Sequence, residues 1–318
     1  MTVAAETPVH RSRRRPSALR RVARGSVPYL LILPVIVVIT AILGYPLYRL
    51  VTLSFQQYGL PELIQRKGVW IGIDNYTSVL RDDVFWDVLL RTVVFTAATV
   101  GLTIGLGTLI AFLLIRVSAW VRVLLTAGLV LAWSMPAVVA VQVWFWMTNF
   151  QNGVLNYVLT EARLGDYAQH DWYETTFSKL AMVSLLIVWG AVPFVAITVY
   201  AGLAQVPREL VEAAEIDGAG PVRVFRDVTF PILKPIFLIL TSLSIIWDFG
   251  VFTQPYLLIG PSHVDPTNYV MGVYVFIEAF GNSDYGRGAA ISLLMLLIVA
   301  ILSVFYVRRM VKMGEVAR

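Results

Sequence analysis

The sequence contains no cysteine, only three histidines and little charge. Of its 318 residues, 14% are charged and 58% are hydrophobic, whereas soluble globular chains carry about 25% charged residues. The lack of cysteine excludes disulfides, thiolate catalysis and cysteine-based zinc sites. His10, His170 and His263 are far apart, in predicted tail or loops, which argues against a metal site. The composition therefore favours a chain that folds in lipid.

Lysine is also scarce, and its placement excludes one class of enzyme. A phosphate-binding P-loop needs Gly-Lys followed by Ser or Thr. None of the four lysines follows a glycine. No set of clustered His, Asp or Glu near a membrane face suggests a membrane enzyme either. We expect a chain that neither hydrolyses ATP nor acts as an enzyme.

The formal net charge of +5 does not indicate a nucleic-acid partner, because the basic residues gather beside the membrane. Seven arginines precede the first apolar run: Arg11, Arg13, Arg14, Arg15, Arg20, Arg21 and Arg24. A basic arm there is typical of a topology signal or of contact with anionic lipid, and orientation alone is the simpler interpretation. The uncharged run that follows, Ser26–Tyr48, exceeds the core of a cleavable signal peptide.

Six stretches are long and apolar enough to cross a membrane, which takes about 20 residues. They are 27–48, 92–115, 123–150, 180–206, 236–258 and 288–307. The sequence thus predicts an all-α polytopic membrane protein with six transmembrane helices, organised as a basic tail (1–26), a membrane domain (27–312) and a second tail (313–318).

Lysine and arginine also predict the orientation. Placing the N-terminus inside puts seventeen of the 25 basic residues in 1–26, 116–122, 207–235 and 308–318. This bias obeys the positive-inside rule, so we expect a cell-membrane protein with both termini cytoplasmic. The external connections are then 50–90, 151–179 and 259–287.

The cytoplasmic connection between the fourth and fifth spans predicts a short helix. Pro207 suits a first-turn position and Glu209 suits the positive end of the helix dipole. Gly218 suits the stop, because glycine adopts the left-handed conformation at little cost. We therefore expect a helix over 207–217. A second amphipathic piece, with Val222, Phe225 and Val228, leads through Pro231 and Pro235 into the fifth span.

This loop resembles the EAA motif of ABC importer permeases. Glu212-Ala213-Ala214 is followed after three residues by Gly218, and after nine more by Val228-Thr229-Phe230-Pro231. The family motif has Ile and Leu where this chain has Val228 and Phe230. The resemblance implies the type I importer permease fold, with 207–231 as the loop that docks on a separate ATPase. The residues it implicates in coupling are Glu212, Ala213, Ala214, Asp217, Gly218, Phe225 and Pro231.

The resemblance also implies partners and cofactors. It implies a heterodimer with a second permease, two ATP-binding subunits that carry ATP and Mg²⁺, and an extracytoplasmic solute-binding protein. No cofactor is implied for this chain itself. Further segments are similar to sugar permeases of the maltose and glycerol-phosphate type, such as Gly72-Ile73-Asp74-Asn75-Tyr76 and Gly153-Val154-Leu155-Asn156-Tyr157. They imply a sugar cargo, for example the disaccharide trehalose. The family's Gly-Gly-Pro appears here as Ile259-Gly260-Pro261.

The substrate path should contain polar and aromatic residues inside the membrane. Asp248 is the strongest candidate, because a charge within a span is costly and should face a cavity or a partner; pairing with the second permease is the structural alternative. Weaker candidates, for which packing is the alternative, are Trp247, Trp133, Trp189, Phe194 and Gln254. The rival functions are an importer permease for another polar solute and an ion-driven secondary transporter. A secondary transporter would need ion-coupling carboxylates or broken helices in the membrane, and Asp248 is a single carboxylate.

Overall fold

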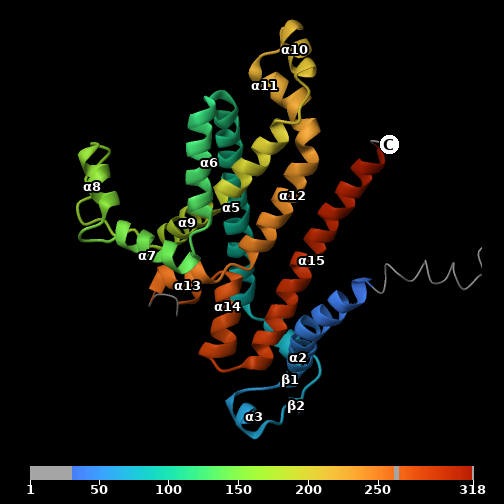
Figure 1. Ribbon diagram of the computed structural model, residues 1–318. Helices are drawn as coiled ribbons and strands as arrows, with labels where there is room; N and C mark the ends of the chain where they lie inside the picture. Colours follow the sequence, from blue (N-terminus) through green and yellow to red (C-terminus); the bar gives the residue numbers. More distant parts are fainter. Residues whose placement is uncertain (1–30, 261–264, 317–318) are drawn as a thin grey trace, which may run out of the picture. The chain divides into compact units, whose positions relative to one another are not determined.

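The computed structural model describes residues 31–260 and 265–316, and the chain divides into two units, Met1–Thr52 and Leu53–Arg318 (Figure 1). The described residues of the first unit belong to one apolar helix, Leu31–Ser54. This helix contains a π-helical turn, η1 (Thr40–Gly44), followed by α2 (Tyr45–Ser54). It corresponds to the predicted first span, whereas the predicted basic tail at 1–26 lies outside the described residues.

The second unit contributes four more helices that are long and apolar enough to cross a membrane. They are α5 (Asp83–Arg116), α9 (Thr176–Leu203), the run Pro221–Phe249 and α15 (Tyr285–Val316). A sixth span is formed if the bent pair α6 (Ala119–Trp133) and α7 (Ala137–Met147) is counted as one. The prediction of an all-α protein with six spans is therefore confirmed, with the third span broken.

The predicted third span, 123–150, is divided into the two helices α6 and α7. The axes of α6 and α7 differ by 100°. Pro136 stands at the break as the residue that precedes α7. Proline lacks the N–H that would continue the helix, and its ring disfavours helical geometry in the preceding residue, Met135. The bend therefore follows from local backbone chemistry.

The fifth span also differs from the predicted 236–258. It begins with α11 (Pro221–Val224) and a π-helical turn, η2 (Phe225–Thr229), and continues as α12 (Phe230–Phe249). A separate helix, α13 (Thr253–Ile259), follows. Where the chain leaves α12, Gly272 approaches its backbone so closely that a Cβ there would lie 2.4 Å from the Val251 carbonyl oxygen. Because α12 ends at Phe249, Asp248 is its penultimate residue and does not lie in the middle of a span.

α5 and α9 lie side by side and form the centre of the second unit (Figure 1). A Cβ at Gly107 of α5 would lie 2.5 Å from the Val195 side chain of α9, so only glycine permits this approach. The hydroxyl groups of Thr99 and Ser184 are 2.8 Å apart and form a hydrogen bond between the same helices. Small residues and interhelical hydrogen bonds of this kind hold helices together in lipid, where apolar contact alone gives little preference.

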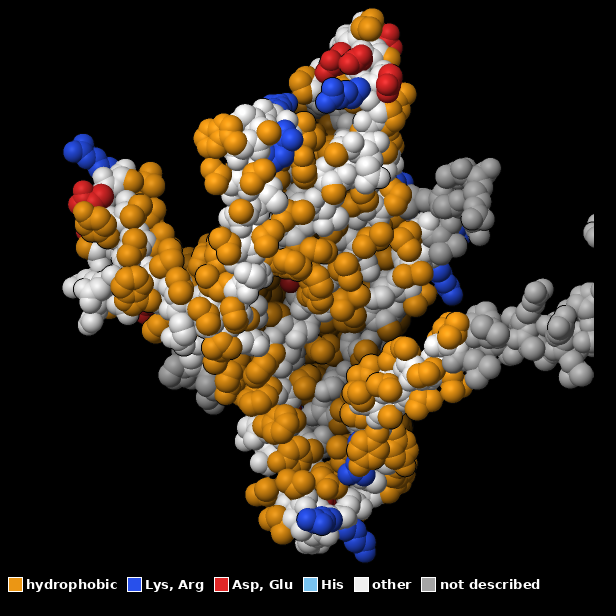
Figure 2. Space-filling model, viewed as in Figure 1, with side chains coloured by type: hydrophobic (Ala, Val, Ile, Leu, Met, Phe, Trp, Pro, Cys, Tyr) orange, Lys and Arg blue, Asp and Glu red, His pale blue; other side chains and the backbone are white. Residues whose placement is uncertain are grey.

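Short elements occupy the three predicted external connections. They are β1 (Gln56–Gln57), α3 (Leu60–Gln65), β2 (Val69–Trp70), α4 (Asp74–Leu80), α8 (Val154–Glu161), η4 (Pro266–Asn268), α14 (Met271–Phe276) and η5 (Ile277–Gly281). The two strands pair antiparallel, with Gln56 opposite Trp70. Within the second unit, this hairpin lies at the opposite end from α10 (Arg208–Ile216) (Figure 1). Hydrophobic side chains cover most of the face seen in Figure 2, and acidic side chains gather near α10.

Candidate functional site

The helix predicted over 207–217 is present as α10, Arg208–Ile216. Pro207 is its N-cap residue, Glu209 lies in its first turn and Asp217 is its C-cap residue. Gly218 follows with φ of +80°, the left-handed conformation expected of it. Its backbone N–H donates to the Glu215 carbonyl oxygen at 3.0 Å, which closes the last turn of the helix.

The segment after α10 turns back toward the spans. In α11, Val222 is 81% exposed, so the predicted amphipathic stripe does not bury all of its apolar residues. Phe225, the first residue of η2, packs edge to face on Phe112 of α5, with ring centroids 5.4 Å apart. Pro231 lies in the first turn of α12, where a missing N–H is tolerated. Phe225 is thus the contact that anchors the predicted coupling segment to the spans.

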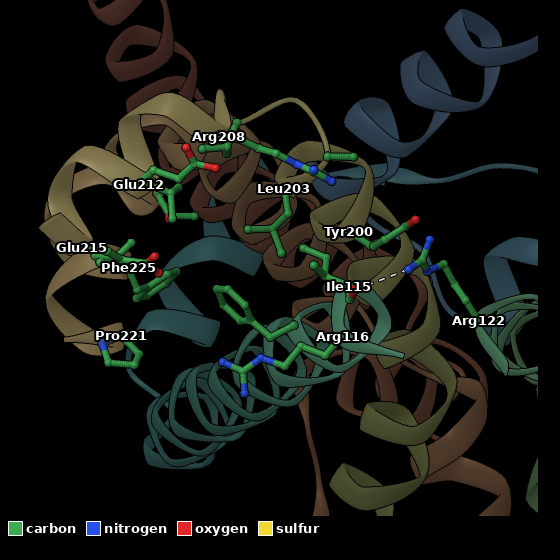
Figure 3. A pocket seen from close by; sticks show the side chains of 16 residues that line it. Ile115, Arg116, Arg122, Tyr200, Leu203, Arg208, Glu212, Glu215, Pro221 and Phe225 are labelled. Atoms are coloured by element: carbon green, nitrogen blue, oxygen red, sulfur yellow. Dashed lines mark hydrogen bonds between the residues drawn. The ribbon is translucent and has the colours of Figure 1, made fainter. Parts of the chain in front are cut away.

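A cavity of about 630 Å³ lies between α10 and the ends of α5, α6 and α9 (Figure 3). Glu212, Glu215 and Arg208 line it from α10, while Arg116 and Arg122 line it from α5 and α6. The Arg122 Nε–H donates to the Leu114 carbonyl oxygen at 2.7 Å, so this guanidinium caps the end of α5. The local sequence does not single out these three arginines, because no local pattern indicates that the helix ends meet.

The other face of α10 carries small and apolar side chains. Ala213 is exposed and Ala214 is half-buried, and neither lines the cavity. Ile216 is 86% exposed although it is a large apolar residue. The α10 helix therefore has one face with acids turned toward the cavity and another with uncovered apolar surface.

A second cavity, of about 250 Å³, brings together all six residues predicted for the substrate path. Trp133 comes from the end of α6, Trp189 and Phe194 from α9, Trp247 and Asp248 from α12, and Gln254 from α13. These residues are spread over more than a hundred positions of the sequence. The bend after Trp133 and the end of α12 at Phe249 both open onto this cavity.

Three of these aromatic rings form a connected wall. Trp133 and Phe194 stack with centroids 5.6 Å apart and planes 23° apart. Phe194 also contacts Trp247, at 5.8 Å with a 59° tilt. Trp133 is 52% exposed and Trp247 is 51% exposed, so both indoles still offer surface to a ligand or to another chain.

Asp248 is the polar centre of this second cavity. Asp248 is only 5% exposed to solvent. Among the residues that the structure describes, its carboxylate has neither a hydrogen-bond donor nor an ion-pair partner. A buried carboxylate without partners is unfavourable unless something else supplies the donors. The carboxylate is therefore placed to accept hydrogen bonds from a bound molecule or a neighbouring chain.

Neither cavity resembles a metal centre. In the described ranges 31–260 and 265–316, no three or more His, Asp or Glu residues lie close enough together to hold a metal ion. What the second cavity offers is aromatic surface, one carboxylate and one amide, from Gln254. Such a lining suits a polar ligand that also presents apolar faces.

Comparison with known proteins gives one family and several relatives. The family described as "binding-protein-dependent transport system inner membrane component" matches residues 103–311. The diacetylchitobiose uptake system permease protein DasB of Streptomyces coelicolor is 43% identical over 91% of this chain and 88% of its own length. The trehalose/maltose transport system permease protein MalF of Thermococcus litoralis is 28% identical over 88% of this chain and 92% of its own.

The fold has a counterpart among solved structures. One chain of a bacterial ABC transporter that imports the acidic polysaccharide alginate superposes with a TM-score of 0.76. The match covers 92% of this chain and 98% of that chain, at 17% sequence identity. At this identity the similarity concerns the fold alone, and it agrees with the type I importer permease fold that the coupling motif implied.

Proposed function

The chain belongs to the family of binding-protein-dependent transport system inner membrane components, and from this premise we propose that it is the sugar-translocating permease subunit of an ATP-driven importer. It is a membrane component of a transporter and not an enzyme. The observation that carries the sugar assignment is the cavity in which Trp133, Trp247 and Asp248 meet. Aromatic faces and a carboxylate together suit the CH surfaces and hydroxyl groups of a sugar.

The exposed segment formed by α10 and α11 supports the proposal that this chain docks on an ATPase partner. Ile216 and Val222 expose apolar side chains at the tip of an otherwise charged segment. Exposed apolar residues beside charged ones are typical of protein interfaces. Two ATP-binding subunits, each with ATP and Mg²⁺, would supply the energy, one of them through contact with this segment. The turn at Gly218 and the Phe225 contact would transmit the motion of that subunit to the spans.

The small volume of the second cavity supports the proposal that a second permease subunit completes the substrate site. Ligand pockets usually measure about 300–1,000 Å³, and this chain encloses only about 250 Å³. Trp133 and Trp247 remain half exposed at its edge. A second, unlike permease subunit would cover these side chains and complete the site. An extracytoplasmic binding protein would deliver the sugar to it.

The cargo is proposed to be a disaccharide. A diacetylchitobiose permease is the more similar of the two relatives above, at 43% identity, and a trehalose/maltose permease is similar at 28%. Diacetylchitobiose and trehalose are therefore the two sugars to test first. The distribution of basic residues supports an orientation with α10 and both termini in the cytoplasm.

Reconstitution tests the function directly. The chain would be placed in lipid vesicles with a second permease and an ATPase encoded beside it, and the binding protein would be added outside. We expect ATP-dependent accumulation of one of the two disaccharides, and no accumulation when the ATPase is omitted. Uptake without the ATPase, driven by an ion gradient, would contradict the assignment.

A further inference from the structure

The carboxyl group of Asp248 lies where nothing in this chain balances a negative charge. The lining of the substrate cavity includes no lysine, arginine or histidine. Among the residues that the structure describes, none donates a hydrogen bond to the oxygen atoms of Asp248. A carboxylate buried in this way loses its hydration and gains no contact that compensates for the loss. A proton on one of the two oxygens would remove this cost.

The end of α12 makes the charged form less favourable still. Asp248 is the penultimate residue of this helix, which ends at Phe249. The last carbonyl groups of a helix carry a partial negative charge, which repels an anion. Burial, the lack of a donor and the helix end therefore all act in one direction. They favour a carboxyl group that keeps its proton.

An uncharged carboxyl group offers a ligand more than a carboxylate does. It has one O–H donor and keeps a carbonyl oxygen as acceptor, whereas a carboxylate can only accept. Although Asp248 is buried, its oxygen atoms open onto the cavity. A sugar presents hydroxyl groups, which donate and accept, together with ring and glycosidic oxygens, which only accept. The proton on Asp248 would let this side of the site meet a sugar oxygen that a carboxylate would repel.

We propose that Asp248 binds the sugar as an uncharged carboxyl group, which donates a hydrogen bond to one oxygen of the cargo and accepts another through its carbonyl oxygen. This role rests on the proposed function, since it concerns the cargo of the same cavity. Apart from Asp248, the residues that α6, α7, α9, α12 and α13 contribute to the lining include no titratable side chain. Sugar affinity should therefore fall when a rising pH removes the proton from this one group.

Infrared difference spectroscopy tests the protonation state directly. The purified complex of this chain with its partner permease and ATPase would be compared with the same complex carrying Asp248→Asn, both at neutral pH. We expect the wild type to show the carbonyl band of an uncharged carboxyl group, absent from the variant and shifted by isotope-labelled aspartate. A carboxylate band in its place would overturn the proposal.

Sugar binding to the same complex, without the binding protein, tests the donated hydrogen bond. The probes are diacetylchitobiose and trehalose. Asp248→Asn is the conservative replacement, because its amide keeps a donor and an acceptor without a charge, and it should retain most of the affinity. Asp248→Leu keeps neither and should bind the sugar about tenfold more weakly. Wild-type affinity should fall from about pH 6 to about pH 9, whereas that of Asp248→Asn should stay constant.

A substitution elsewhere controls for changes in assembly. Asp227 pairs with Arg226 at the surface and does not line the substrate cavity, so Asp227→Asn should keep the wild-type affinity and its pH dependence. A wild-type affinity that rises with pH, or an assembled Asp248→Leu complex that binds as tightly as wild type, would overturn the role of Asp248 while leaving the sugar-permease function intact. A wild-type complex that binds neither disaccharide would instead overturn the proposed cargo, and the sugar contact of Asp248 with it.

Discussion

The guanidinium of Arg287, near the start of α15, forms an ion pair with the carboxylate of Asp82, which caps the start of α5. Asp82 also accepts a hydrogen bond from the Val84 backbone N–H at 2.9 Å. Arg287 reaches further, to the Ser78 hydroxyl at 3.0 Å and to a Glu278 carboxylate oxygen at 3.3 Å. One side chain thus ties together α4, α5, η5 and α15 at the end of the second unit opposite α10.

Replacing Arg287 should destabilise this end. In Arg287→Met, the partly buried carboxylates of Asp82 and Glu278 would lose their shared cation. Removal of one partner from a fully buried ion pair costs about 3 kcal/mol, and partial exposure to solvent lowers this cost. A clear drop in the unfolding temperature of the detergent-solubilised protein is expected. Arg81→Met, which alters an exposed arginine beside Asp82, should leave it unchanged; equal losses in both variants would contradict the role of the network.

Glu278 should make stability depend on pH. Burial raises the pKa of Glu278 above its ordinary value, although the Arg287 guanidinium lowers it in part. The folded chain then binds the proton to higher pH than the unfolded chain. The contribution of Glu278 to stability is therefore full below its unfolded pKa, and it is lost as the pH rises through its folded pKa.

Glu278→Gln removes this titration. Measured by thermal unfolding from pH 4 to pH 8, the variant should gain stability relative to wild type as the pH rises. Glu161→Gln, at an exposed position of α8, should show a constant difference. A Glu278→Gln curve parallel to that of the wild type would show that burial does not penalise the charged form.

The turn after α10 should be intolerant of a β-branched residue. Gly218 has φ of +80° with open space around it, so the obstacle is conformational and not steric contact with neighbours. An L-residue in that conformation costs about 1–2 kcal/mol. Gly218→Val should reduce sugar-stimulated ATP hydrolysis and uptake several-fold while the protein still inserts.

The same substitution two residues later provides the control. Gly220 has φ of −70°, and a Cβ added there would have no atom within 4 Å. Gly220→Val should therefore keep uptake near the wild-type rate. If both variants transport normally, the turn at Gly218 is not needed for coupling.

Trp133 should contribute to sugar affinity. Trp133→Ala removes an indole that stacks on Phe194 at the cavity, so the half-saturating sugar concentration should rise about tenfold, equivalent to about 1.4 kcal/mol. Trp120→Ala, at the other end of α6 and about 20 Å away along the helix, should not change it. The measurement is the concentration dependence of uptake in vesicles, and an equal effect of both substitutions would show a general loss of stability.

Local chemistry and hydropathy were sufficient to predict much of the fold. The long apolar runs identified the spans, and Pro207, Glu209 and Gly218 predicted α10 to within a residue at each end. The substrate-path residues could be chosen because Asp248 and the tryptophans stand out in apolar surroundings. That they line one cavity could not be known, since it depends on how α6, α9, α12 and α13 pack.

Other features were beyond local reasoning. The size of the bend at Pro136, 100°, could not be predicted, because hydropathy measures solvent preference and not helix direction. Gly272 approaches the backbone of Gly250 and Val251, just beyond the end of α12 at Phe249, although it lies more than 20 residues further along the chain. Arg287 and Asp82 lie 205 residues apart in the sequence. No local sequence pattern around either residue indicates that the two form an ion pair.

The π-helical turn η2 lies between α10 and the α12 residues that line the second cavity. The Phe230 N–H bonds to the Phe225 carbonyl oxygen five residues back, so this turn holds one residue more than an α-helical turn. Deleting a single residue from Phe225–Thr229 would restore α-helical winding and leave the direction of the residues beyond it nearly unchanged. A single deletion in α12 ahead of Trp247 would instead rotate Trp247 and Asp248 by about 100° relative to α10. The extra residue of η2 thus makes this segment tolerant of a one-residue deletion that α12 itself could not accept.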